Sequence, residues 1–242
     1  MPVTALPYVL DKDDPNTTPM GLIALQTDET IESELANYFS DLRNDFFVTR
    51  VPSSLEVTQD TLAAMQSALP SAAALLPSAR RFSVIGYGCT SASSVIGSDR
   101  VATLVKSVCD TAHVTNPLQA TLACAKDLGL SRMALLSPYI EEVNATLRQA
   151  LSRGGLTTDV FGSFEIMEEA KVVRISKSSI VEAAVQLGQD TAVEGVFISC
   201  TNLRTVDALP EIEKRIGKPV LSSNQSLAWH MRKLSKQTTE NT

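Results

Sequence analysis

Arg81-Phe-Ser-Val-Ile-Gly86, followed at once by Tyr87-Gly88-Cys89-Thr90-Ser91, is an apolar strand pattern that ends in a cysteine and two hydroxyl residues. A second such pattern, Val193-Glu-Gly-Val-Phe-Ile-Ser199, ends in Cys200-Thr201-Asn202. Short apolar runs of this kind are typical of strands buried on both faces of a parallel sheet. Since Cys89 and Cys200 are 111 positions apart, the two stretches indicate a repeat within the chain.

Strand and helix patterns alternate on both sides of these two stretches. We expect further strands over 21–26, 46–51, 132–136 and 157–161, and helices over 31–39, 58–76 (broken at Pro70), 143–151 and 178–187. The repeat offset places Leu25 on Leu136 and Asp28 on Tyr139, so strand falls on strand and turn on turn. The sequence therefore predicts an α/β protein of two similar parallel-sheet halves that face each other.

Near the ends of the halves the repeat offset changes slightly. Asn116 then matches Asn224, at an offset of 108. We expect the N-terminal half to span residues 1–115 together with a C-terminal helix over 225–242, and the C-terminal half to span 116–224.

Composition narrows the class of protein. The 242 residues include 21 basic and 27 acidic side chains, with no run of Lys or Arg, which argues against binding to nucleic acid or to an anionic membrane. Two histidines make a histidine-rich metal site or a Ser-His-Asp triad improbable, and four cysteines make no disulfide framework. Acidic residues near the N-terminus argue against an export signal, and the apolar stretch 62–76 is too interrupted to span a membrane. We expect a cytoplasmic protein with reduced thiols.

The two strand-end cysteines carry the strongest chemical signal. Ligands of open parallel sheets bind beyond the carboxyl ends of the strands. If each cysteine opens a helix, the free N–H groups there lower the pKa of the thiol, and the hydroxyls of Thr90, Ser91 and Thr201 can help to hold a carboxylate. The alternative is that both cysteines are merely small packing residues. We assign that packing role to Cys109 and Cys124, which lie in helical patterns.

Weaker candidates lie elsewhere in the turns. Asp28 and Tyr139 occupy equivalent strand-end turns, where the alternative is an exposed loop residue. Three acidic residues suggest a solvated helix start: Glu165, Glu168 and Glu169. Arg204 is either a surface charge or a carboxylate clamp, and His230 is expected to pack. Gly86-Tyr-Gly88 lacks the Gly-x-Gly-x-x-Gly spacing, so no dinucleotide cofactor is predicted.

These residues together resemble a known family. Paired Cys-Thr steps resemble the aspartate/glutamate racemase superfamily. Within it, Gly21-Leu-Ile, Thr27-Asp28-Glu29-Thr30-Ile-Glu32, Ser137-Pro138-Tyr139 and Pro219-Val-Leu-Ser-Ser-Asn-Gln225 resemble the maleate isomerase and arylmalonate decarboxylase branch. The turns at 87–91 and 199–204 are most similar to the ectoine-utilisation (EutA-type) proteins of that branch. The resemblance covers residues 20–235 and implies two Rossmann-like (flavodoxin-like) halves, related by a pseudo-two-fold axis, with the active site between them.

The resemblance also implies roles for individual residues. Cys89 and Cys200 would be the catalytic pair, and Tyr139 would lie near the substrate carboxylate. In racemases of the superfamily one thiolate removes the α-proton and the opposite thiol returns one. In maleate isomerases a thiolate adds to the double bond, and in arylmalonate decarboxylases only the second-half cysteine is kept and protonates a carbanion. None of these reactions uses a cofactor or metal.

Two positions depart from the maleate isomerase pattern. Asp28, and Glu168 or Glu169, stand where those enzymes carry asparagine. Carboxylates at these positions would repel a dianion but suit an ammonium group. Together with the polar residues next to the cysteines and the family tyrosine, they make up the expected substrate-binding set: Asp28, Thr90, Ser91, Tyr139, Glu169, Thr201 and Asn202.

The function that follows is a cofactor-independent isomerase or racemase of a small amino acid or derivative, of the ectoine-degradation type. The alternatives are a maleate cis–trans isomerase, an arylmalonate decarboxylase-like enzyme, and a non-catalytic ligand-binding or regulatory protein. The expected partner is a small carboxylate substrate, and the expected assembly is a homo-oligomer, a dimer or larger.

Overall fold

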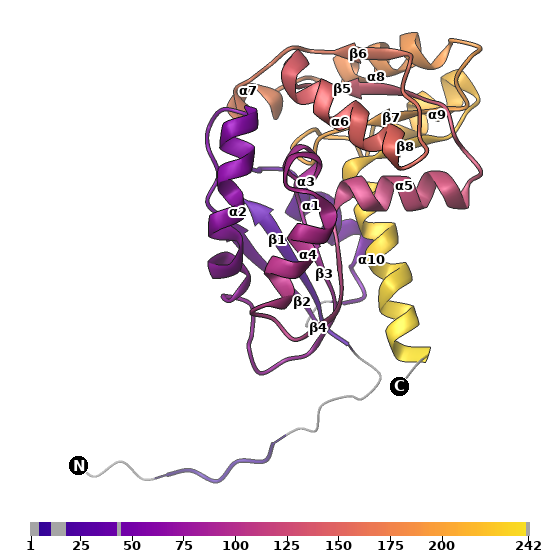
Figure 1. Cartoon of the computed structure of the whole chain (residues 1–242). Helices are drawn as coiled ribbons and strands as arrows, with labels where there is room; N and C mark the ends of the chain where they lie inside the picture. Colours follow the sequence, from indigo (N-terminus) through magenta and orange to yellow (C-terminus); the bar gives the residue numbers. More distant parts are fainter. Residues whose placement is uncertain (1–4, 11–17, 43–44, 241–242) are drawn as a thin grey trace.

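Two four-stranded parallel sheets form the framework of the computed structural model, which describes residues 5–10, 18–42 and 45–240 (Figure 1). The first sheet has the order β2-β1-β3-β4 and the second β6-β5-β7-β8. The strands are β1 (Met20–Leu25), β2 (Phe46–Val51), β3 (Phe82–Tyr87), β4 (Thr111–Thr115), β5 (Met133–Ser137), β6 (Phe161–Ser163), β7 (Gly195–Ile198) and β8 (Val220–Ser222). The second sheet repeats the order of the first, as the α/β repeat predicted.

Helices connect successive strands and cover both sheets. They are α1 (Ile31–Tyr38), α2 (Gln59–Ala73), α3 (Thr90–Ile96), α4 (Ser98–Lys106), α5 (Pro117–Asp127), α6 (Glu141–Arg153), α7 (Glu169–Val172), α8 (Lys177–Gly188), α9 (Leu209–Ile216) and α10 (Ser223–Glu240). Every residue is buried in five of the strands, β1, β3, β5, β7 and β8. This continuous burial explains why the sequence shows apolar runs there and no alternation.

The chain crosses back from the second sheet to the first through α10. This helix starts directly after β8 and runs alongside the first half in Figure 1, against β3, α1 and α5. Leu227, Ala228 and Met231 of α10 share a buried cluster with Met20 and Val84 of the first sheet. Among the described residues, no helix has the length and apolar character needed to cross a membrane.

Two sequence predictions of local structure were wrong. Helix α2 does not break at Pro70 but continues to Ala73, because Leu69 and Ala73 are fully buried and hold the last turn against the core. The strand expected over 157–161 is displaced to β6. Met133 and Leu135, two positions apart, donate to the carbonyls of Thr157 and Val160, three positions apart, so one extra residue bulges out before the ladder begins.

Candidate active site

Cys89 lies at the carboxyl end of β3 and begins a helix, as expected. It is the N-cap of α3, and its Sγ accepts a hydrogen bond from the backbone N–H of Ala92 at 3.3 Å. Its side chain is 3% exposed, and the Ser91 hydroxyl lies 3.6 Å from its sulfur. The thiol is therefore fixed in the interior, at the end of the first sheet that faces the second half.

Cys200 occupies the equivalent position after β7 but begins no helix. Its backbone has φ = +125°, a region that residues other than glycine rarely adopt, and the chain continues in turns through Asn202. The N–H of Cys200 donates to Ser223 Oγ at 3.0 Å, and its Sγ accepts from the Asn202 N–H at 3.4 Å. The prediction of a second helix start is wrong, because a turn held by α10 takes its place.

Hydroxyl groups next to the cysteines tie the two halves together. Thr90 Oγ1 lies 2.7 Å from Ser223 Oγ, and Thr201 Oγ1 donates to the carbonyl of Gly88 at 3.3 Å. Both threonines are buried. In this structure these two hydroxyls are used within the protein rather than presented to a ligand.

Two carboxyl groups are buried on the same site. Asp28, 2% exposed, accepts from the N–H groups of Thr30 and Ile31 through Oδ1. Glu169, 7% exposed, accepts from Asn202 Nδ2 at 2.7 Å. The prediction of a solvated helix start at Glu169 is wrong, since this residue turns inward at the start of α7.

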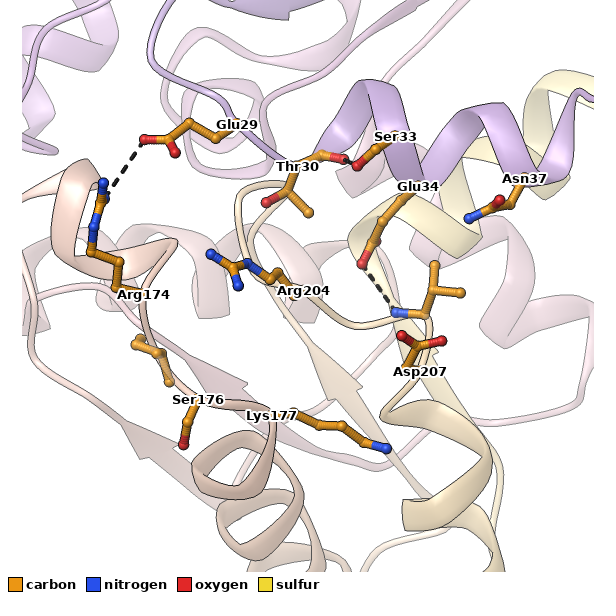
Figure 2. A pocket seen from close by; sticks show the side chains of 12 residues that line it. Glu29, Thr30, Ser33, Glu34, Asn37, Arg174, Ser176, Lys177, Arg204 and Asp207 are labelled. Carbon is orange, nitrogen blue, oxygen red and sulfur yellow. Dashed lines mark hydrogen bonds and ion pairs between the residues drawn. The ribbon is translucent and has the colours of Figure 1, made fainter.

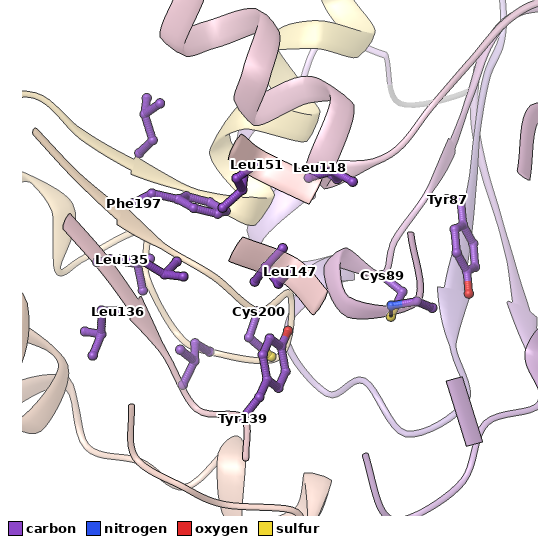
Figure 3. Packing of buried hydrophobic residues seen from close by; sticks show 14 of the residues in the cluster. Tyr87, Cys89, Leu118, Leu135, Leu136, Tyr139, Leu147, Leu151, Phe197 and Cys200 are labelled. Atoms are coloured by element: carbon purple, nitrogen blue, oxygen red, sulfur yellow. Dashed lines mark hydrogen bonds between the residues drawn. The ribbon is translucent and has the colours of Figure 1, made fainter. Parts of the chain in front are cut away.

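Tyr139 completes the group of buried side chains. It follows β5 and is 2% exposed, and burial together with the neighbouring Cys200 raises its pKa. Figure 3 shows its ring beside Cys200, with the Cys89 side chain directed to the same region from the other half. After burial, the negative charges of Cys200, Cys89 and Glu169 further raise the pKa of Tyr139, so these groups are near one another. The structure thus brings together five of the predicted residues: Asp28, Cys89, Tyr139, Glu169 and Cys200.

A short pairing between the halves lies beside this site. Val57, after β2, donates its N–H to the Met167 carbonyl at 2.9 Å, and the Glu169 N–H donates to the Leu55 carbonyl at 3.0 Å. Glu56 and Glu168 form an antiparallel bridge between these two bonds. The segments 55–57 and 167–169 thus join across the two halves beside Glu169.

Burial dominates the proton affinities in the site. Desolvation raises the pKa of Cys89 to about 12, opposed by the Ser91 hydroxyl and the Ala92 N–H, and it also raises the pKa of Cys200 well above its ordinary value. The lowered thiol pKa expected from the strand-end position is therefore wrong for this closed state. Burial also raises the pKa of Asp28, and it raises the pKa of Glu169 to about 7, with Asn202 opposing and the charge of Asp28 adding to the rise.

The sequence model described as arylmalonate decarboxylase matches residues 33–242, most of the chain. The chain belongs to the arylmalonate decarboxylase family. This confirms the branch that the motifs at 21–32, 137–139 and 219–225 indicated. The narrower similarity to ectoine-utilisation proteins stays a prediction.

Relatives of two kinds share the fold and parts of the sequence. Arylmalonate decarboxylase of Bordetella bronchiseptica is 32% identical over 111 residues, 46% of either chain. Maleate isomerase of Alcaligenes faecalis is 23% identical over 84% of this chain and 85% of its own. A liganded mutant of arylmalonate decarboxylase superposes with a TM-score of 0.81 at 25% identity, covering 90% of this chain and 93% of that one. A maleate isomerase mutant of Pseudomonas putida S16, with maleate, superposes with a TM-score of 0.79 at 20% identity, covering 88% and 90%.

Sequence reasoning missed three residues whose hydrogen bonds hold the backbone around Cys200. Ser223 and Asn224 begin α10, and Glu34 lies in α1. The match between Asn116 and Asn224 was a usable signal, because both stand at the end of a last strand and the start of a helix. Glu34 carried none, since an acidic residue in a helical pattern is usually solvated.

Arg204 faces a different cavity. Figure 2 shows its side chain, with Arg174 and Lys177, in a space of about 590 Å³ between α1 and the start of α8. Among the described residues, the lining of this cavity includes Glu29 and Thr30 but neither Cys89 nor Cys200. The Glu29 N–H and the Thr30 hydroxyl both donate to Asn202. Arg204 is therefore no clamp on a ligand held between the cysteines in this state.

Proposed function

We propose that the chain is a cofactor-independent two-cysteine isomerase that inverts the α-carbon of a small amino acid or an amino-acid derivative. The observation that carries the proposal is the convergence of Cys89 and Cys200, one from each half, on a buried site that also holds Tyr139 and two carboxyl groups. The ligand itself would be a small carboxylate, bound between the thiols.

The proposed step conserves all atoms. One cysteine, as thiolate, removes the α-proton and becomes a thiol, and the electron pair passes into the substrate as a carbanion. The thiol on the other face delivers its proton to the same carbon and becomes the thiolate. Protonation from the opposite side inverts the configuration, and exchange of the sulfur-bound proton with solvent then returns the two sulfurs to their starting states.

Charge favours an amino substrate. Both thiols have raised pKa values, and the charges of Glu169 and Asp28 raise them further, so a thiolate needs a cation close to it. An ammonium group between Asp28 and the thiols would supply that charge, and it would be stabilised by the carboxylate in turn. A second carboxylate on the substrate would act in the opposite direction.

A maleate cis–trans isomerase is the second candidate. Here a thiolate adds to the double bond, the resulting single bond rotates, and elimination of the thiolate restores the double bond as the trans isomer. The raised pKa of Glu169, about 7, supports this candidate, because a protonated carboxyl group does not repel a dianion. The similarity to maleate isomerase over 84% of the chain also supports it.

The narrower assignments rest on sequence alone. The turns at 87–91 and 199–204 are the support for a substrate from ectoine degradation. A decarboxylase-like reaction is a weaker proposal because it needs only the second-half cysteine, and a binding protein needs neither thiol. Cytoplasmic location and homo-oligomer formation likewise stay proposals.

Solvent exchange separates these reactions. We expect the protein in deuterated water to introduce deuterium at the α-carbon of an amino substrate, and Cys89→Ser and Cys200→Ser each to lower kcat by about a thousandfold or more. The control is Cys124→Ser, which changes a buried thiol outside the site. Conversion of maleate with no exchange on amino acids would replace the leading proposal with the second, and binding without turnover by either class would leave a binding protein.

A further inference from the structure

Glu34 is a buried acid that the proposed chemistry does not use. It lies on α1 of the first half and is 6% exposed. Its carboxylate accepts hydrogen bonds from three donors of a loop in the second half and from one side chain of α10. The donors are Thr205 N (2.5 Å), Thr205 Oγ1 (3.0 Å), Val206 N (3.0 Å) and Asn224 Nδ2 (2.9 Å).

The bonded loop is the one that presents the second cysteine. We define the Cys200 loop as residues 200–206, between β7 and the turn before α9. Asn224 Nδ2, which donates to Glu34, also donates to the Thr201 carbonyl at 2.8 Å. Glu34 thus holds the loop directly at its far end and through Asn224 close to the thiol. Figure 2 shows the Glu34 side chain on α1 beside this loop.

This loop begins with unfavourable backbone geometry. A β-carbon at φ = +125° costs conformational energy, so the arrangement at Cys200 persists only if surrounding contacts enforce it. Two successive N–H groups pointing at one carboxylate form an anion-binding turn, and bonds to a charged acceptor are stronger than bonds between neutral groups. Glu34 supplies this loop with a carboxylate from the first half that accepts from three of its donors.

We propose that Glu34 is a positioning residue that holds the Cys200 loop in its strained conformation and so keeps the second thiol aligned with the first. It acts through backbone and Asn224 contacts and touches no reacting atom. Its catalytic consequence rests on the two-cysteine function proposed above, whereas its effect on the loop does not.

The test measures the two thiols separately. Buried thiols react with iodoacetamide only when their surroundings open locally, so the labelling rate of each cysteine, followed by peptide mass spectrometry, reports local opening. We expect Glu34→Gln to raise the rate at Cys200 by about tenfold or more and to leave Cys89 unchanged, because the variant loses a charged acceptor of four hydrogen bonds. Glu32→Gln is the matched control, since Glu32 is on the same helix but pairs with Arg50 near the surface.

Each outcome decides the proposal. Faster labelling of Cys200 alone supports it. An unchanged rate at Cys200 overturns it, and so does an equal rise at both cysteines, which would indicate general loosening of the fold. If Glu34→Gln does not fold, Thr205→Val replaces it, because it removes one hydroxyl bond to Glu34 at nearly constant volume; a rise of about threefold at Cys200 is then expected.

Kinetics provide a second readout. For a substrate that the unchanged protein converts, we expect Glu34→Gln to lower kcat about tenfold with little change in KM, since the loop positions a thiol rather than the substrate. A protein that converts no candidate substrate would defeat the proposed function but not the role of Glu34, which the labelling rates decide alone.

Discussion

Glu169 makes the stability of the fold depend on pH. Its pKa is about 7 in the fold against an ordinary 4.5, because burial disfavours the charged form. A carboxyl whose folded pKa is raised binds more protons when folded, so the contribution of Glu169 to stability is greatest below pH 4.5, falls as the pH rises toward 7, and is level above that. Glu169→Gln removes the titration and keeps an acceptor for Asn202.

We therefore expect Glu169→Gln to be more stable than the unchanged chain at pH 8, by up to about 3 kcal/mol, and not at pH 4.5. Thermal unfolding at the two pH values measures the difference. Glu168→Gln is the control, as its side chain pairs with Lys171 at the surface. An equal effect at both pH values would show that the fold does not raise the pKa of Glu169.

Asp28 tests the charge preference of the site. We expect Asp28→Asn to reduce kcat/KM for amino substrates and to raise it for maleate-like dianions, each by about tenfold, because the carboxylate attracts the first class and repels the second. The measurement is the ratio of kcat/KM between the two classes. A ratio that does not move would mean that Asp28 serves only as the cap on the N–H groups of Thr30 and Ile31.

At the residue scale, strand-end position was the informative signal in the sequence. It located Cys89, Cys200, Asp28 and Tyr139 correctly at strand ends, which the fold brings together. It failed on the thiol pKa because no local pattern reports how deeply a turn is buried. The charge pattern alone suggested a solvated Glu169, whereas the family resemblance placed it correctly in the site; its N–H bond to Leu55 of the other half could not be predicted.

Two glycines show how tightly elements pack. A β-carbon on Gly195 in β7 would lie 2.6 Å from the backbone carbonyl oxygen of Pro219, which also accepts from the Val196 N–H. A β-carbon on Gly86 in β3 would lie 2.7 Å from Met231 Sδ, the movable part of a flexible side chain in α10. Rigid and flexible neighbours should respond differently to the same added methyl group.

We expect Gly195→Ala to lower the free energy of unfolding by about 3 kcal/mol and Gly86→Ala by about 1 kcal/mol. Urea denaturation of the two variants provides the comparison. Equal losses would mean that the edge strand β8 moves as easily as Met231.

At the element scale, hydrophobic periodicity predicted the type and order of most strands and helices, including β2 at its observed bounds. Its errors have local causes. Pro70 signals a helix end, yet tertiary packing of Leu69 and Ala73 carries α2 past it. The bulge before β6 depends on hydrogen bonds to β5, which the residues 157–161 alone do not specify.

At the scale of the whole molecule, the packing of the two halves limits the access of reagents to the site thiols. Cys89 and Cys200 are each 3% exposed, whereas Cys109 is only partly buried. With excess iodoacetamide we expect Cys109 to react first, and Cys89 and Cys200 about a hundredfold more slowly, because the joined segments 55–57 and 167–169 must separate before reagent enters. Comparable rates at all three would show that the site stands open in solution.

The internal repeat was the most reliable guide to the whole architecture. Equivalent cysteines predicted two sheets, and both sheets have the same strand order. Contacts between the halves were not predictable in this way, because they break the repeat. Glu34 of the first half accepts from Val206 of the second half. It also accepts from Asn224, at the start of the helix α10 that packs on the first half.

The return of α10 to the first sheet also bears on how the chain is synthesised. Met20 and Val84 emerge early from the ribosome, but Leu227 and Met231, which cover them, emerge more than a hundred residues later. Throughout that interval α1 covers this face of the nascent first sheet, but the part that α10 will cover stays exposed. Folding of the first half is thus completed only near the end of translation, and chaperones that bind exposed apolar strands have a long window in which to act on it.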